Sequence, residues 1–177
     1  MKCFPFMKDI SGKICLLVGG GEVALRKAEK LHPFGTQIVV CAHEIREDLC
    51  ALAKKCHREY DASLLAGADF VIAATDDEAL NARVAADCRT RGIPVNCVDK
   101  KELCDFYFPA LITAGDVTIG ISTGGASPAL AAALRAWLEQ KLPENLAEIA
   151  RRVEALRGTM PPKEYAALVH KMLEEGV

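Results

Sequence analysis

Three consecutive glycines, Gly19-Gly20-Gly21, stand between an apolar run and a segment with helical spacing, and they are the first residues whose pattern suggests chemistry. With Ala24 they form Gly19-x-Gly21-x-x-Ala24, which provides a tight turn, a position without a side chain and a small residue where helix meets strand. Backbone amides at the start of such a helix would face an anion. The pattern predicts a turn that binds the pyrophosphate of a dinucleotide; the alternative is a turn that only joins a strand to a helix.

Carboxylates follow two later apolar runs. Asp99 ends the run that begins at Pro94, and Asp76 follows Asp69–Thr75. Parallel sheets bind ligands at the carboxyl ends of their strands, so both acids lie where a ligand would be expected. Beside a nicotinamide, Asp99 could act as an acid-base group; with Lys100 beside it, it could equally belong to a solvated turn.

Three further loops carry candidate contacts. His43 and Glu44 follow a short apolar run and are candidates to bind ribose or adenine, or else form an exposed capping turn. Thr75 begins an acidic loop in which helix capping is an equally good explanation for the carboxylates. The stretch Ser122–Pro128 offers amides to an anion at the start of a helix, with Ser127 as the expected N-cap.

Alternating strands and helices position these residues. The expected strands are Lys13–Val18, Gln37–Cys41, a short edge strand at His57–Tyr60, Asp69–Thr75 and Pro94–Asp99. Three helices are expected between them: one that begins near Ala24, one over Ile45–Cys56 and one that follows Thr75 and runs to about Arg91. This order predicts the α/β class, with a Rossmann-like parallel sheet over residues 1–113.

The alternation then stops. Phe106–Ile112 and Val117–Ser122 flank a turn at Thr113–Asp116 and predict an antiparallel hairpin. A helix is expected over residues 129–141, and two amphipathic helices follow between residues 143 and 177. Residues 114–177 are therefore expected to form a small α+β dimerisation region with C-terminal helices.

Composition excludes several classes of function. The 177 residues carry a formal net charge of -2, which does not favour nucleic acid or an anionic membrane as a partner. The amino terminus does not resemble a signal peptide and no apolar run reaches the length of a membrane span, so a cytoplasmic location is expected.

The cysteines predict free thiols that pack as small hydrophobic residues in a reducing compartment. None has the short spacing of a zinc site, so no metal site is predicted. The eight residues are Cys3, Cys15, Cys41, Cys50, Cys56, Cys88, Cys97 and Cys104.

Taken in order, four segments resemble the precorrin-2 dehydrogenase family, which includes stand-alone enzymes and the amino-terminal module of sirohaem synthase. The resemblance covers about residues 1 to 145. Its segments are Val18–Ala24 with Arg26 and Lys27, Ala73–Asp77 with Asn81, Val95–Asp99, and Ser122–Pro128 with Leu134 and Arg135.

The resemblance implies NAD-dependent oxidation of the tetrapyrrole precorrin-2 to sirohydrochlorin by a homodimer whose active site lies near the subunit interface. It places Asp99 on the catalytic aspartate and Ser127 near the tetrapyrrole. Its cofactor-contact stretches fall on Gly21, Glu22, Val23, His43 and Glu44, to which the residue pattern adds Gly19, Thr75 and Asp76.

The substrate carries eight carboxylates, so it needs anion sites despite the negative net charge. Ser122, Gly124, Gly125 and Ser127 are expected to supply them. Four basic residues could also bind the substrate carboxylates or could be ordinary surface charges: Arg26, Lys100, Lys101 and Arg135.

Other functions stay open at this point. Some members of the family also insert ferrous iron, and Asp99 could serve there too; a separate chelatase is the alternative partner. A non-catalytic protein that binds a dinucleotide or tetrapyrrole would use the same fold, as would a dehydrogenase of a small substrate.

Overall fold

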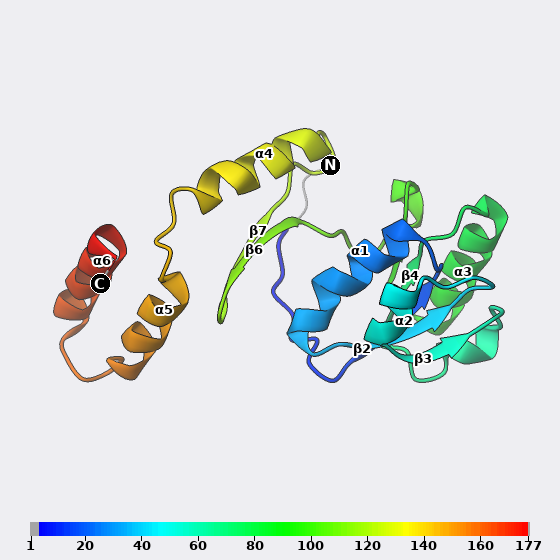
Figure 1. The fold of residues 1–177 in the computed structure, drawn as a ribbon, viewed down its shortest axis with the longest axis horizontal. Coiled ribbons are helices and arrows are strands. Elements are labelled where there is room, and N and C mark those ends of the chain that lie inside the picture. The colour runs from blue at the N-terminus through cyan, green and yellow to red at the C-terminus, as the bar shows by residue number, and fades with distance from the viewer. Residues whose placement is uncertain (1–3, 177) are drawn as a thin grey trace. The chain divides into compact units, whose positions relative to one another are not determined.

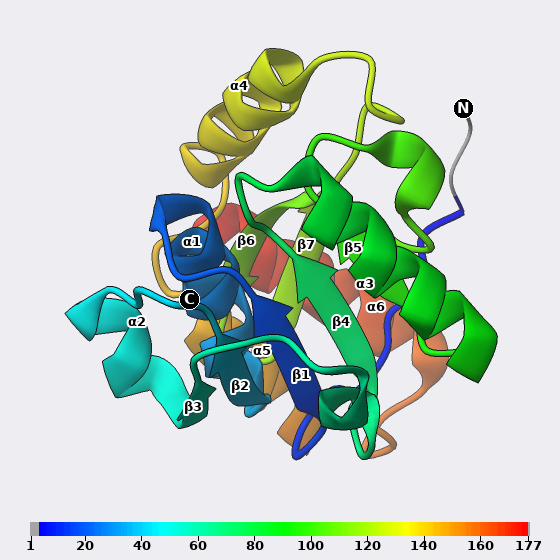
Figure 2. The same ribbon diagram turned by 90° about the vertical axis from the view of Figure 1, so that its right-hand side faces the viewer.

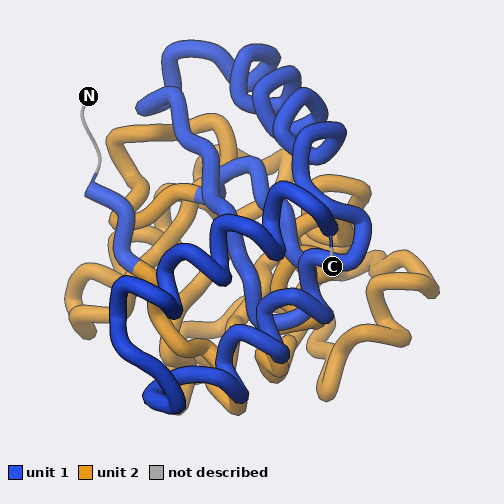
Figure 3. Tube along the Cα trace, turned by 90° about the vertical axis from the view of Figure 1, so that its left-hand side faces the viewer, with its two compact units in different colours: residues 1–6, 108–177 blue, residues 7–107 orange. Residues whose placement is uncertain are grey.

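The computed structural model describes residues 4–176, which form two compact units (Figure 3). One unit is Met7–Tyr107, and the other contains the chain from Phe108 onward together with the residues before Met7. Cys3 lies outside the described residues. The two units are described separately below.

Five parallel strands form the sheet of the first unit, in the order β3-β2-β1-β4-β5 (Figures 1 and 2). From β1 the chain builds outward through β2 to β3 and then crosses to β4 on the other side, so the order reverses between β1 and β4. The strands are β1 Ile14–Val18, β2 Gln37–Cys41, β3 Ala53–His57, β4 Phe70–Ala73 and β5 Val95–Cys97.

The central strands carry apolar residues on both faces, and both faces are buried, as their continuous apolar sequences predict. One face of the sheet packs against α3, whose Val84, Ala85 and Cys88 are fully buried. Residues of the opposite strand face, such as Leu17 and Ile72, are also fully buried. The helices of this unit are α1 Glu22–Leu31, α2 Glu47–Leu52 and α3 Glu78–Arg91.

The second unit contains the predicted hairpin and three helices. β6 Ala110–Ala114 pairs antiparallel with β7 Val117–Ile121, and α4 contacts both strands. α5 contacts β7 and α6. The buried apolar side chains of this second unit are Ile112, Leu146, Ile149 and Met172. The helices are α4 Pro128–Glu139, α5 Leu146–Ala155 and α6 Pro162–Glu175.

Two expected elements beside β2 are wrong. The helix expected over Ile45–Cys56 ends at Leu52, and the edge strand is Ala53–His57 instead of His57–Tyr60. The alanine and lysine content of this segment favours a helix locally, but pairing with β2 extends the chain from Ala53 onward.

The hairpin also differs in detail from its prediction. Its turn is Gly115–Asp116, with Gly115 at φ +57°, because Thr113 and Ala114 pair with β7. Asn96 Nδ2 donates a hydrogen bond of 2.9 Å to the Phe106 carbonyl, which keeps Phe106 with the first unit. The two units divide between Tyr107 and Phe108, before the hairpin, and not after residue 113.

The described cysteines are free thiols. Four of them are buried as expected, namely Cys15, Cys41, Cys88 and Cys97, but Cys50 and Cys56 are exposed and do not contribute to the core. Across residues 4–176, no helix combines the length and the apolar character that crossing a membrane requires.

Candidate functional site

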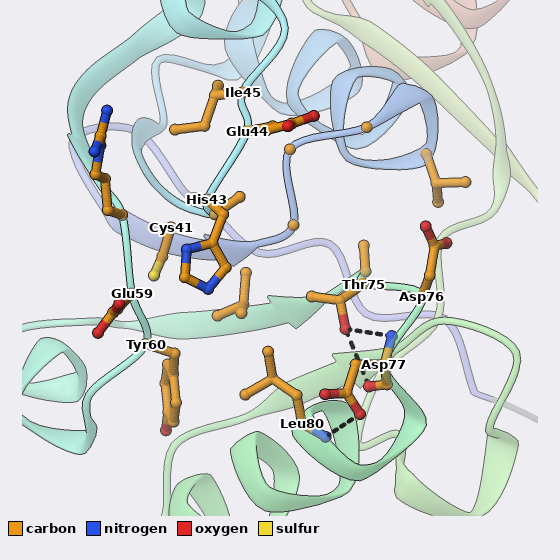
Figure 4. Close-up of a pocket in the computed structure, with 18 of the residues that line it drawn as sticks. Cys41, His43, Glu44, Ile45, Glu59, Tyr60, Thr75, Asp76, Asp77 and Leu80 are labelled. Carbon is orange, nitrogen blue, oxygen red and sulfur yellow. Dashed lines mark hydrogen bonds between the residues drawn. The ribbon is translucent and has the colours of Figure 1, made fainter.

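A cavity of about 1130 Å³ opens at the carboxyl ends of β1, β2 and β4, where the strand order reverses (Figure 4). Doubly wound sheets bind their ligands at such a switch point. All of its lining residues belong to the first unit. Among them are all eight residues predicted to contact a cofactor: Gly19, Gly21, Glu22, Val23, His43, Glu44, Thr75 and Asp76.

The glycine turn is held by the loops on either side. Gly19 has φ +135°, and its amide donates to the Cys41 carbonyl over 2.9 Å. A Cβ at Gly19 would overlap the Ala74 carbonyl oxygen, and one at Gly20 would overlap the Glu44 carbonyl oxygen. Packing of the protein itself therefore requires glycine at both positions.

Gly21 differs from its two neighbours. It has an ordinary φ of -90° at the N-cap of α1, and a Cβ there would meet no protein atom within 4 Å. Neither backbone strain nor packing explains the missing side chain. An open position at the amino-terminal end of a helix is what an approaching pyrophosphate needs, so the cavity fits a dinucleotide.

The loop after β4 is fixed by one buried amide. The Thr75 hydroxyl donates to Asn81 Oδ1 over 2.8 Å, and Asn81 Nδ2 donates to the Thr75 carbonyl over 2.8 Å. Asp77 caps α3 by accepting from the Ala79 and Leu80 amides at 2.9 and 3.0 Å. Capping thus accounts for Asp77, whereas the Asp76 carboxylate points away from α3 towards the glycine turn (Figure 4).

The loop after β2 carries His43 and Glu44, both exposed in the cavity wall. It leads into Arg46, whose guanidinium contacts Asp48 at 2.7 Å and Glu22 at 3.4 Å. The hydrogen bond from Arg46 lowers the pKa of the Asp48 carboxyl. Arg46 is therefore largely neutralised by protein carboxylates and ties the start of α2 to the start of α1.

The far wall of the cavity contains residues that the sequence did not single out: Arg58, Glu59, Tyr60 and Arg83. Tyr60 donates to Asp87 over 3.0 Å, and the Arg83 guanidinium lies 5.4 Å from the centre of its ring. Burial, with the Asp87 contact, raises the pKa of Tyr60. Placing the edge strand at Ala53–His57 would have revealed Arg58, Glu59 and Tyr60, because they follow its carboxyl end, whereas Arg83 lies on α3 and has no such signal in the sequence.

Asp99 lies outside the lining of this cavity, in the exposed loop that follows β5. Among the described residues it is the one non-glycine residue with positive φ, at +62°. Such strain persists where surrounding structure imposes it and is frequent at functional sites. Cys104 closes the loop, since its thiol donates to the Cys97 carbonyl over 3.0 Å and its sulfur accepts from the Cys97 amide over 3.2 Å.

A half-buried lysine on α1 interacts electrostatically with this loop. The pKa of Lys27 is lowered to about 8, first by burial and then by the nearby Lys30, whereas Cys104 and Asp99 act in the opposite direction. Lys100, next to Asp99, is paired with Glu78 over 2.9 Å.

The predicted substrate residues Ser122, Gly124, Gly125 and Ser127 belong to the second unit. Ser127 caps α4 as expected, with its hydroxyl accepting from the Leu130 amide over 3.1 Å, and Pro128 occupies the first turn. Gly124 and Gly125 have φ of +63° and +78°, and the Ser122 hydroxyl accepts from the Gly124 amide over 3.2 Å.

A parallel sheet with a glycine turn at its switch point defines a dinucleotide-binding protein of the Rossmann type. The chain belongs to an NAD(P)-binding family, whose model matches residues 6–110. Residues 115–141 match a second family model, described as the central part of sirohaem biosynthesis proteins.

Curated relatives are siroheme synthases. That of Ectopseudomonas mendocina (strain ymp) is 43% identical over 153 residues, covering 85% of this chain and 33% of the relative. The siroheme synthase of Psychrobacter arcticus (strain DSM 17307 / VKM B-2377 / 273-4) is 39% identical over 168 residues, covering 92% of this chain and 31% of the relative. The chain thus spans about a third of the length of these relatives.

Among solved structures, "SirC, precorrin-2 dehydrogenase" superposes with a TM-score of 0.74 at 21% identity. The match covers 97% of this chain and 89% of that one, and it confirms the predicted fold. The family resemblance found in the sequence is likewise confirmed by the two family models and the siroheme synthase relatives.

Proposed function

We propose that this protein is an NAD-dependent precorrin-2 dehydrogenase that produces sirohydrochlorin. The observation that carries the proposal is the switch-point cavity, in which Gly21 is open to a ligand although packing does not require glycine there. The names of the siroheme synthase relatives and of the SirC structure supply the substrate class.

The eight predicted cofactor residues would hold the dinucleotide along the glycine turn and the loops after β2 and β4. When bound, NAD supplies a hydride acceptor. Amides at the start of α1 would hold its pyrophosphate, and Asn81 would keep the Thr75 loop fixed against it.

Asp99 is proposed as the acid-base residue that takes the proton released from the substrate. Its exposed carboxylate and its left-handed backbone support this role, because the loop presents the acid at a strand end at a cost in strain. Ser122, Gly124, Gly125 and Ser127 are proposed to bind substrate carboxylates through their amides and hydroxyls.

The decisive assay supplies precorrin-2 and NAD and follows NADH together with the sirohydrochlorin spectrum. Asp99→Asn tests the base, because asparagine tolerates a left-handed backbone. We expect NAD affinity to be kept and turnover to fall by about 10²- to 10⁴-fold. Glu102→Gln, an exposed carboxylate in the same loop, is the matched control and should retain turnover.

Unchanged turnover in Asp99→Asn would remove the base from this position. A folded protein that binds NAD but never oxidises precorrin-2 would reject the dehydrogenase and favour a non-catalytic binding protein. Binding of NAD without any binding of tetrapyrrole would favour a dehydrogenase of a small substrate. Adding ferrous iron to sirohydrochlorin, with and without protein, distinguishes a bifunctional enzyme from one that relies on a separate chelatase.

NAD is proposed over NADP because Glu44 and Glu59 line the cavity and Arg46 is already paired with carboxylates. The two acids would repel a 2′-phosphate, whereas Arg58 and Arg83 in the far wall would attract one, so the proposed preference requires the acids to lie nearer the ribose. Calorimetric titration with each dinucleotide checks this preference, and equal affinities would contradict it.

A homodimer formed through α4 is also proposed. Leu130, Leu134 and Trp137 share one face of this helix at i, i+4 and i+7, and they are 52%, 38% and 56% exposed. Such a stripe suits burial against a second copy. Light scattering should give a dimer for the wild type and a monomer for Trp137→Glu, with Lys141→Glu beyond the end of the helix as control.

A further inference from the structure

Two exposed thiols lie side by side at one edge of the parallel sheet. Cys50 belongs to α2 and Cys56 to β3, and their Sγ atoms are 3.3 Å apart. They are the two exposed thiols among the cysteines that the structure describes; Cys104 is partly buried and the others are buried. Hydrophobic packing, which explains the buried cysteines, gives no reason for this pair.

The local backbone fixes the pair. Ala53 both follows the last residue of α2 and begins β3, so the chain passes from helix to strand without a loop. Pairing of β3 with β2 places Cys56 opposite Val40, whose side chain is fully buried, and Leu49 anchors α2 in the core. The backbone that carries each cysteine is therefore held in place, so the short distance between the two Sγ atoms does not depend on a mobile segment.

The distance suits bond formation. A disulfide needs its sulfurs at about 2.05 Å, which rotation of two exposed side chains can provide from a contact of 3.3 Å. Within residues 4–176 no third His, Cys, Asp or Glu joins the pair in a group that could hold a metal ion. The pair therefore has the features of an oxidisable dithiol and not those of a metal site.

We propose that Cys50 and Cys56 form a redox-active dithiol, which low-molecular-weight disulfides oxidise to an intramolecular disulfide. The thiolate of one cysteine attacks a sulfur of the small disulfide, forms a mixed disulfide and releases one small thiol. The second cysteine then attacks the protein sulfur of that mixed disulfide, forms the Cys50–Cys56 bond and releases the second small thiol. The protein loses two hydrogen atoms, that is two protons and two electrons, and the small disulfide takes them up as it is reduced to two thiols.

The modification site adjoins the cavity. Arg46, immediately before α2, and Arg58, immediately after β3, both line it. Oxidation would link the two segments that carry these arginines, so the disulfide would stiffen one wall of the cavity. The proposal does not rest on the dehydrogenase function, because both thiols and the oxidant act without NAD or tetrapyrrole.

Tryptic mapping of the folded full chain tests the proposal directly. Lys54 and Lys55 lie between the two cysteines, so trypsin separates the fragment Glu47–Lys54 from Cys56–Arg58. After treatment with oxidised glutathione, and before any alkylation, we expect the intact chain to be lighter by two hydrogen atoms. Once the remaining thiols are alkylated and the chain is digested, we expect these two fragments to stay joined. Dithiothreitol should separate them again.

Single variants show whether the two thiols act together. Cys50→Ser and Cys56→Ser should each retain glutathione on the remaining cysteine, because no resolving thiol is present. Circular dichroism verifies that each variant is folded. The proposal is overturned if the wild-type fragments separate without reductant, if either fragment is joined to a different cysteine, or if the bond forms between two chains.

Discussion

Replacing Gly20 by alanine is expected to destabilise the first unit, whereas the same replacement at Gly21 should leave it folded and impair NAD binding. A Cβ at Gly20 would overlap the Glu44 carbonyl oxygen and lie 2.9 Å from its carbonyl carbon and 3.0 Å from the Ala42 Cβ. The loop cannot simply withdraw, because the Arg46 amide donates to the Gly20 carbonyl over 3.1 Å.

The magnitudes follow from these contacts. Overpacking costs about 1–3 kcal/mol, and losing the Arg46–Gly20 hydrogen bond adds about 1 kcal/mol, so we expect Gly20→Ala to lower the free energy of unfolding by roughly 2–4 kcal/mol. At Gly21 a Cβ meets nothing within 4 Å, and alanine at this N-cap costs less than about 1 kcal/mol. Loss of one amide contact to a phosphate, about 1.5–3 kcal/mol, would weaken NAD binding by about tenfold to a hundredfold.

Urea unfolding and calorimetry separate the two effects. Far-ultraviolet circular dichroism follows the whole chain, and the fluorescence of the single tryptophan, Trp137, follows the second unit as an internal reference. NAD titrations are then made on wild type and Gly21→Ala under conditions where both are folded.

Equal stability of Gly20→Ala and Gly21→Ala would show that the Glu44 loop does not constrain the glycine turn. Unchanged NAD affinity in Gly21→Ala would remove the argument that its missing side chain makes room for a ligand, and with it the main support for the cofactor site.

Three further outcomes are expected. Asp77→Ala removes an N-cap that accepts two amide hydrogen bonds and should cost about 1 kcal/mol in thermal unfolding, whereas Asp76→Ala should not. Asn81→Ala removes the partner of the Thr75 amide and carbonyl, while the Thr75 hydroxyl keeps its bond to the Asp77 carbonyl, and it should cost about 2–3 kcal/mol in urea unfolding while weakening NAD binding. Equal affinity would show that the Thr75 loop does not matter. The pKa of Lys27 is lowered to about 8 in the folded chain, mainly by burial, whereas an unfolded lysine has a pKa of about 10.4. Between these two pH values the unfolded chain therefore binds more protons than the folded chain. Wild-type stability relative to Lys27→Met should therefore rise with pH from about 8 to about 10.5, and a constant difference in urea unfolding across this range would contradict the lowered pKa.

The amino-acid sequence alone determined the features that depend on neighbouring residues. Apolar runs predicted the buried strands, and residue type predicted the cap at Ser127 and an acidic, cap-like start for the helix after Thr75, because a cap needs only its own side chain and the next turn. The glycines at a strand-to-helix corner likewise predicted where the cavity lies. The roles of Asp99 and of the residues in the second unit stay predictions.

Tertiary pairing decided the rest. Ala53–His57 became a strand because β2 offers it a hydrogen-bonded edge, which no local propensity encodes, and that strand brought Arg58 and Tyr60 to the cavity and Cys56 to Cys50. Only the folded chain distinguishes Gly19 and Gly20, which packing requires, from Gly21, which it leaves open. The spacing of the glycines in the sequence is the same in either case, because the atoms that exclude a side chain at Gly19 and Gly20 belong to other loops, which only the folded chain brings close.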